Sequence, residues 1–124
     1  MDITPVIPAG RQIVERYGSG GFRISGVDYS GSVLVFPTET LGWDVADFAE
    51  VTSESLGAVR DRGSIEILLL GCGRRMLPVP KAIRAELKQA GMTVDAMDTG
   101  AACRTYNVLI GEGRLVAAAL LLPR

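Results

Sequence analysis

Apolar and polar residues alternate with a period of two near the start of the chain and with longer periods further on. Residues 22–25 alternate, residues 26–31 supply glycines and other turn residues, and residues 33–36 are apolar up to Pro37. An alternating segment, a turn and an apolar segment that stops at proline predict an antiparallel β-hairpin. Before it, the prolines and glycines of residues 1–21 predict an extended N-terminal arm.

The rest of the chain alternates between strand and helix patterns. After a short strand near residues 41–43, it predicts a helix from Thr52 to Gly63, strands over 65–70, 93–97 and 115–122, and helices over 80–90 and from Asp98 or Thr99 to Gly111. Such alternation indicates right-handed crossovers, with 65–70 and 115–122 as interior strands. The expected fold is a three-layer α/β single domain over residues 1–124, with a mixed, largely parallel central sheet flanked by helices and an N-terminal β-hairpin.

Composition fits this fold. A chain of 124 residues with 48% hydrophobic residues can bury one core. Residues 1–5 hold an acid and a proline where a signal peptide needs a basic and then an apolar segment. The longest apolar run, residues 115–122, is shorter than the ~20 residues of a membrane span. We therefore expect a cytoplasmic protein without a membrane span.

Charge is unevenly distributed along the chain. Residues 1–59 hold three arginines against eight acidic residues, whereas residues 60–124 hold ten basic residues against six acidic ones. Either the fold has an acidic and a basic face, or these charges are solvated surfaces that pair within the fold. With a net charge of −1 and 6% aromatic residues, the chain lacks the basic, aromatic surface that nucleic-acid binding uses.

The chain has no histidine and only two cysteines, Cys72 and Cys103. The lack of histidine excludes Ser-His-Asp and Cys-His catalysis and removes the commonest metal ligand. The two cysteines are too far apart in sequence for a CxxC zinc or redox motif. We expect both to be reduced and buried, with a bridge between them as the alternative. No cofactor, metal or catalytic residue is assigned.

The segment Gly71-Cys72-Gly73-Arg74-Arg75 lies between a predicted buried strand and a predicted helix. It lacks the third glycine of a dinucleotide fingerprint, because Met76 stands there, and it lacks the lysine and hydroxyl of a Walker A loop. The carboxyl edge of parallel strands is nevertheless where α/β folds bind ligands. Either the glycine amides and an arginine bind an anion, or the glycines only permit a turn whose arginines are solvated.

A polar row in the last predicted helix invites the same comparison, and its members are Asp98, Thr99, Arg104, Thr105 and Asn107. Its residues either cap the helix and bond neighbouring loops, or complete a site with the glycine turn. The residues predicted to bind a ligand or partner are Gly71, Gly73, Arg74, Arg75, Asp98, Arg104 and Asn107.

Several ordered strings carry a family resemblance that covers nearly the entire chain. They are Tyr17-Gly18-x-Gly20-Gly21-Phe22, Trp43, Gly71-x-Gly73-Arg74-Arg75-Met76-x-Pro78-x-Pro80, Met97-Asp98-Thr99-x-Ala101-Ala102-Cys103-Arg104-Thr105-Tyr106-Asn107-Val108-Leu109 and Glu112-Gly113-Arg114-x-Val116-Ala117-Ala118-Ala119-Leu120. The chain resembles the small α/β domain family that includes mitochondrial complex I assembly factor 3 and the adipogenesis-associated domain protein. The resemblance implies a three-layer α/β domain without an established catalytic activity, and its mitochondrial member assists assembly of the respiratory NADH:ubiquinone oxidoreductase.

Two classes of function follow. The first is a noncatalytic interaction or assembly module, linked to complex I assembly, whose protein partner is a respiratory-chain subunit or another assembly factor. The alternative is a small-molecule or anion-binding protein, or an enzyme, that uses the turn of residues 71–75. A closed pocket or a bound anion favours the alternative, and an exposed apolar surface of the size of a partner favours the module.

Overall fold

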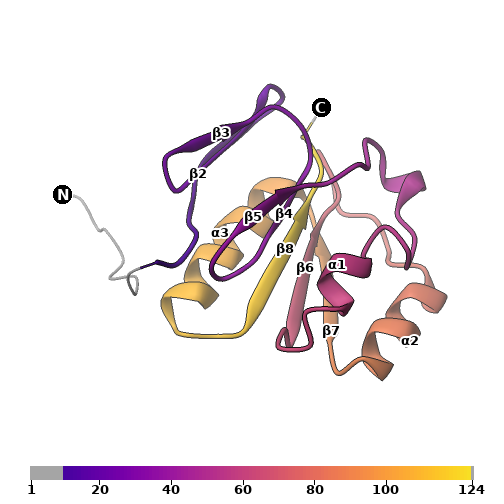
Figure 1. The fold of residues 1–124 in the computed structure, drawn as a ribbon. Coiled ribbons are helices and arrows are strands. Elements are labelled where there is room, and N and C mark those ends of the chain that lie inside the picture. Colours follow the sequence, from indigo (N-terminus) through magenta and orange to yellow (C-terminus); the bar gives the residue numbers. More distant parts are fainter. Residues whose placement is uncertain (1–9, 124) are drawn as a thin grey trace.

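The computed structural model describes residues 10–123, which form two β-sheets and three α-helices (Figure 1). The smaller sheet contains β1 (Val14–Gly18), β2 (Gly21–Ile24) and β3 (Val27–Tyr29). The larger sheet contains β4 (Val33–Val35), β5 (Thr40–Gly42), β6 (Ile67–Gly71), β7 (Thr93–Met97) and β8 (Val116–Leu120). The helices are α1 (Gly57–Arg60), α2 (Lys81–Gln89) and α3 (Thr99–Gly111), with a 3-10 turn η1 (Phe48–Glu50).

The larger sheet has the strand order β5-β4-β8-β6-β7. β6 pairs in parallel with β7 and β8, whereas β4 pairs antiparallel with β5 and β8. The sheet is therefore mixed, and β6 and β8 are interior strands, as predicted. Because the chain passes from β6 to β7 and then back across β6 to β8, the ends of β6 and β8 form a switch point, where α/β folds often bind ligands.

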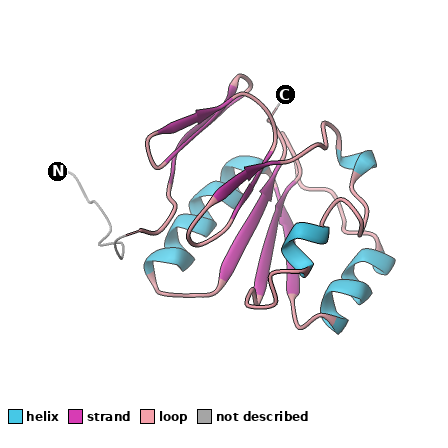
Figure 2. Cartoon of the chain, viewed as in Figure 1, coloured by secondary structure: helices cyan, strands magenta, loops and turns pink. Residues whose placement is uncertain are grey.

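The helices and the two sheets form three layers (Figure 2), because side chains alternate between the two faces of the buried strands. In β6, Leu68 and Leu70 belong to one core cluster, which also contains Ile83 of α2. Leu69 belongs to a second cluster, which contains Tyr106 of α3 and the buried residues of the smaller sheet. Successive side chains of a strand point to opposite faces, so α1 and α2 cover one face, and α3 with the smaller sheet covers the other. The predicted three-layer fold is confirmed.

The start of α3 and the end of α2 follow the sequence signals, whereas α1 covers only Gly57–Arg60 of the helix predicted from Thr52 to Gly63 and has no side-chain cap. The Asp98 carboxylate accepts a hydrogen bond from the Ala101 amide at 2.9 Å, which caps the start of α3. α2 ends before Gly91, whose φ of 86° lies in the left-handed region that glycine adopts without strain. None of the helices within residues 10–123 combines the length and the apolar character that crossing a membrane requires.

The N-terminal hairpin is present, but its strands differ from those predicted. Ser25 and Gly26 have φ of 44° and 83°, and two successive positive φ values make the tight turn that joins antiparallel strands. This turn pairs β2 with β3, so the predicted pairing of residues 22–25 with residues 33–36 is wrong. β4 pairs with β5 and β8 instead.

The predicted arm of residues 1–21 is wrong in part. Residues 1–9 lie outside the described residues, but β1 pairs antiparallel with β2. A register shift between Val14 and Arg16 interrupts the alternation of β1, so its sequence lacks the period of two. Val14 is buried in the core with only 5% of its surface exposed, which makes this segment part of the fold.

Gly21 and Gly18 give a matched test of the smaller sheet. A Cβ at Gly21 would overlap the carbonyl oxygen of Tyr29, and the Gly21 φ of 139° disfavours other residues. A Cβ at Gly18 would meet no atom within 4 Å. We predict that Gly21→Ala lowers the free energy of unfolding by about 2–4 kcal/mol and that Gly18→Ala changes it by less than about 0.5 kcal/mol. Urea unfolding measures both, and equal effects would contradict the close approach of β3.

Candidate functional site

The carboxyl end of β6 lies against the first turn of α3. A Cβ added at Gly71 would lie 3.0 Å from Leu120 Cδ2, 3.1 Å from Thr99 Oγ1 and 3.2 Å from Thr99 Cα. These distances are shorter than ordinary side-chain contacts, so glycine at this position allows α3 to approach the sheet. Gly71, which was predicted to lie in a turn, is instead the last residue of β6, and it is needed for this close packing.

Thr99 lies two residues after the end of β7 and forms hydrogen bonds to residues that follow β6 and β8. Its side chain is fully buried, and its Oγ1 accepts a hydrogen bond from the Gly73 amide at 2.9 Å and donates one to the Leu121 carbonyl at 2.7 Å. The Thr99 amide donates to the Gly73 carbonyl at 2.8 Å. Sequence reasoning placed Thr99 in the polar row but left it out of the predicted site. Its position directly after the helix cap was the available signal.

These contacts occupy backbone groups that an anion would need. The Gly73 amide donates to Thr99, and the Cys72 amide donates to the Met97 carbonyl at 2.9 Å. Gly73 has a φ of 101°, in the left-handed region that favours glycine. α2 begins only at Lys81, so residues 74–80 form a loop and the turn does not lead directly into a helix start.

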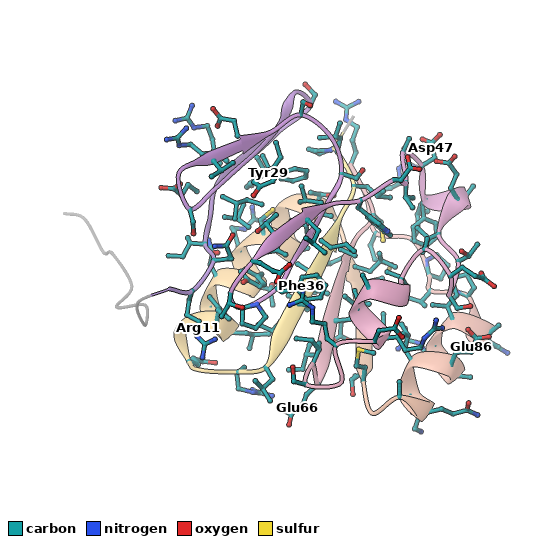
Figure 3. All side chains as sticks on the ribbon, viewed as in Figure 1. Arg11, Tyr29, Phe36, Asp47, Glu66 and Glu86 are labelled. Carbon is teal, nitrogen blue, oxygen red and sulfur yellow. The ribbon has the colours of Figure 1, made fainter. Side chains whose placement is uncertain are left out.

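Beyond the turn, Arg74, Arg75 and Met76 are exposed, and 59% of the Met76 surface is accessible. A hollow of about 110 Å³ lies beside this loop and is lined by Ala46, Asp47, Phe48, Cys72, Gly73, Arg74, Leu121 and Leu122. Figure 3 shows Asp47 at this end of the molecule and Glu66, which precedes β6, at the opposite end. Gly71, Gly73, Arg74 and Arg75 thus lie together where β6 ends.

Arg104 and Asn107 contact the smaller sheet. The Asn107 side chain accepts a hydrogen bond from the Val14 amide at 3.0 Å and donates one to the Val14 carbonyl at 2.8 Å. Arg104 Nη1 donates to the Tyr17 hydroxyl at 2.6 Å. Neither Arg104 nor Asn107 lines the hollow beside Gly73. The seven predicted residues therefore divide between the strand end and the junction of β1 with α3, and Asp98 caps the helix between them.

Tyr17 and Gly100 complete the junction of β1 with α3. A Cβ at Gly100 would lie 2.9–3.1 Å from the Tyr17 ring and hydroxyl, so the ring rests directly on the helix backbone. The Tyr17 surface is nevertheless 40% exposed. Both residues fall within or beside the quoted family strings, but nothing in the sequence alone predicted their contact.

The two cysteines are free and buried, as predicted. Burial raises the pKa of the Cys72 thiol, and it raises the pKa of the Cys103 thiol to about 12. The Arg104 guanidinium opposes the shift of the Cys103 pKa, but burial has the larger effect. Both thiols therefore stay protonated at neutral pH, which makes them poor nucleophiles.

Comparison with known proteins finds a family model and relatives that match most of this chain. A family model described as "Protein of unknown function (DUF498/DUF598)" matches residues 14–121. An uncharacterized protein of Rhodobacter capsulatus is 37% identical over 114 residues, covering 91% of this chain and 86% of the relative. NADH dehydrogenase [ubiquinone] 1 alpha subcomplex assembly factor 3 of Xenopus tropicalis is 37% identical over 112 residues. That match covers 90% of this chain but only 61% of the relative, so the chain spans about three fifths of its length.

Two solved structures share the fold. A protein from Bartonella henselae, described as an outer membrane protein, has a TM-score of 0.85 and 37% identity, covering 94% of this chain and 98% of that chain. A Bordetella pertussis protein described as a Mth938-like domain has a TM-score of 0.84 and 28% identity, covering 99% of this chain and 93% of that chain.

Thr99 offers a test of the strand-end contacts. Thr99→Val keeps the side-chain shape but leaves the buried Gly73 amide and Leu121 carbonyl without their hydroxyl partner. We predict that it lowers the free energy of unfolding by about 2–4 kcal/mol, because each unpaired buried group costs about 1–3 kcal/mol. Thr99→Ser keeps the hydroxyl and is the control. Equal losses in the two variants, measured by urea unfolding, would mean that the methyl group matters and the hydrogen bonds do not.

The cysteines offer a second test. Because both pKa values are raised and both side chains are buried, we predict that the native protein shows no thiol reaction with an aromatic disulfide reagent at pH 8. The unfolded protein should release two equivalents, one from Cys72 and one from Cys103. Rapid release of one equivalent from the folded protein would show that one thiol is accessible and reactive.

Proposed function

We propose that this chain, which belongs to the family described as protein of unknown function (DUF498/DUF598), is a noncatalytic interaction module linked to assembly of respiratory complex I. The observation that carries the proposal is the 37% identity to complex I assembly factor 3 of Xenopus tropicalis across 90% of the chain. The same name applies to the human relative, at 32% identity. Relatives with this name support an assembly-factor-like role and a protein partner.

The exposed loop of Arg74, Arg75 and Met76 is the surface that we assign to the partner. Arg74 and Arg75 are exposed, and among the described residues no ion pair includes either of them. Arginine and methionine are enriched at protein interfaces. The loop starts from Gly73, which Thr99 ties to the sheet, so its base is fixed before binding, and a fixed base lowers the entropy cost of association.

A small-molecule or anion site has less support. The Cys72 and Gly73 amides already donate to protein acceptors. The adjacent hollow has a volume of about 110 Å³, below the ~300–1,000 Å³ of typical ligand pockets. Side chains at this sheet end, rather than backbone amides, are thus the groups that remain free to recognise a binding partner.

Affinity capture from an extract of the source cells tests the proposal. We predict that the double variant Arg74→Glu/Arg75→Glu loses a partner that wild type retains, because the reversed charges repel an acidic surface. Its free energy of unfolding should change by less than about 0.5 kcal/mol, as for other surface substitutions. Arg114→Glu, an exposed arginine before β8, is the matched control and should keep the partner.

The identity of the captured molecules decides between the two functions. A complex I subunit or assembly factor retained by wild type and by Arg114→Glu supports the module. A specific metabolite retained in its place supports the anion or small-molecule alternative. Identical captures by all three proteins would contradict the assignment of Arg74 and Arg75, and a loss of folding in the double variant would identify a structural role.

A further inference from the structure

Strand β7 is an end strand of the larger sheet (Figure 1), and its outer edge is open in the sense that no strand within residues 10–123 pairs with it. The Thr93 amide donates to the Glu66 carbonyl, and the Met97 carbonyl accepts from the Cys72 amide. Backbone groups of successive strand residues point to opposite sides, so residues 93, 95 and 97 bond β6, and the backbone groups of Val94 and Ala96 point outward. Within residues 10–123, β7 pairs with no strand other than β6.

One of these outward groups is covered by a side chain of α2. Arg84 Nη1 donates a hydrogen bond to the Val94 carbonyl at 2.7 Å. Arg84 and Lys88 line a hollow of about 250 Å³ together with Met92, Thr93 and Val94. The hollow thus lies between the basic side of α2 and the open edge of β7.

The basic side of α2 forms no ion pair within residues 10–123. Lys81, Arg84 and Lys88 are exposed and recur at helical spacing, which puts them in one row along α2. Among the described residues, no ion pair includes any of them. Asp95 lies on β7 but alternates with the buried Val94, so its side chain points to the opposite face of the sheet.

The row of cations and the strand edge have matching periods. Arg84 and Lys88 are four residues apart, which is about 6 Å along a helix axis. Side chains on one face of a strand recur about every 6.6 Å. An added strand with acidic residues at alternate positions would therefore place successive carboxylates opposite successive cations of α2.

We propose that the edge of β7 and the basic row of α2 form a docking site for an extended, acidic segment of a protein partner, which adds to the sheet as a sixth strand. An amide of the segment takes the Val94 carbonyl, and Arg84 moves from that carbonyl to a carboxylate of the segment. The Ala96 amide and carbonyl complete the pairing. This inference rests on the proposed function only for the claim that the occupant is a protein, and it uses a surface separate from the Arg74–Arg75 loop.

A synthetic peptide tests the site without the native partner. The probe is a blocked seven-residue peptide in which glutamates alternate with valine and threonine, added to the full chain and followed by amide NMR and calorimetry. We expect the Val94 and Ala96 amide signals to shift and the Ala96 amide to exchange with solvent at least about tenfold more slowly. Arg84→Gln/Lys88→Gln should weaken binding about tenfold, because each exposed ion pair contributes modestly. The matched control Arg114→Gln should bind as wild type does.

Two altered peptides separate strand addition from general attraction of an acidic chain. A peptide with the same sequence but N-methylated at alternate amides cannot bond the strand edge, and a peptide with lysine in place of glutamate has the wrong charge. Loss of binding for both supports the proposal. Equal binding of the N-methylated peptide, shifts confined to α2, dimerisation of the chain through β7, or no binding of the probe would each overturn it. The peptide result does not depend on Arg74 or Arg75, so failure of cellular capture and failure of this site are distinguishable.

Discussion

The close contact between the end of β6 and the first turn of α3 determines how the rest of the structure is arranged. Gly71 has no side chain to keep Thr99 away, and the Thr99 hydroxyl bonds both Gly73 and Leu121. These bonds tie the parallel strands β6, β7 and β8 together at one end, where their carboxyl termini would otherwise leave unpaired groups. The buried Gly73 amide and Leu121 carbonyl thereby have hydrogen-bond partners within the protein.

The pairing of these backbone groups within the protein determines which groups can bind a partner. Because the protein itself uses the amides of the glycine turn, recognition at this sheet end passes to the exposed side chains of the loop that follows. At β7, in contrast, backbone groups that point outward from the sheet edge are not paired with another strand, and Arg84 covers one of them. The two surfaces lie on different elements, and both present exposed cations to a partner. One has two consecutive arginines in the loop after β6, and the other has a row of cations along α2 beside a strand edge.

Local periodicity accounts for the features that the sequence predicted. The strands at residues 65–70 and 115–122, the helix at 80–90 and the Asp98 cap each depend on residues close together in the chain. β1 was missed because its register shift hides the alternation. The contacts of Thr99 and Asn107 were missed because their partners are 26 and 93 residues away. The turn after β6 was located correctly, but the contacts of Gly71 and Gly73 with Thr99 were not predicted.

Native-state hydrogen exchange tests most directly the claim that this strand end is a fixed base carrying a free loop. The Gly73 amide donates to a buried hydroxyl, and the Leu121 amide donates to the Gly71 carbonyl. We predict that both exchange only through global unfolding, while the exposed Arg74, Arg75 and Met76 exchange rapidly. Exchange of Gly73 as fast as that of Arg75 would contradict the account, because the base of the loop would then open independently of the core.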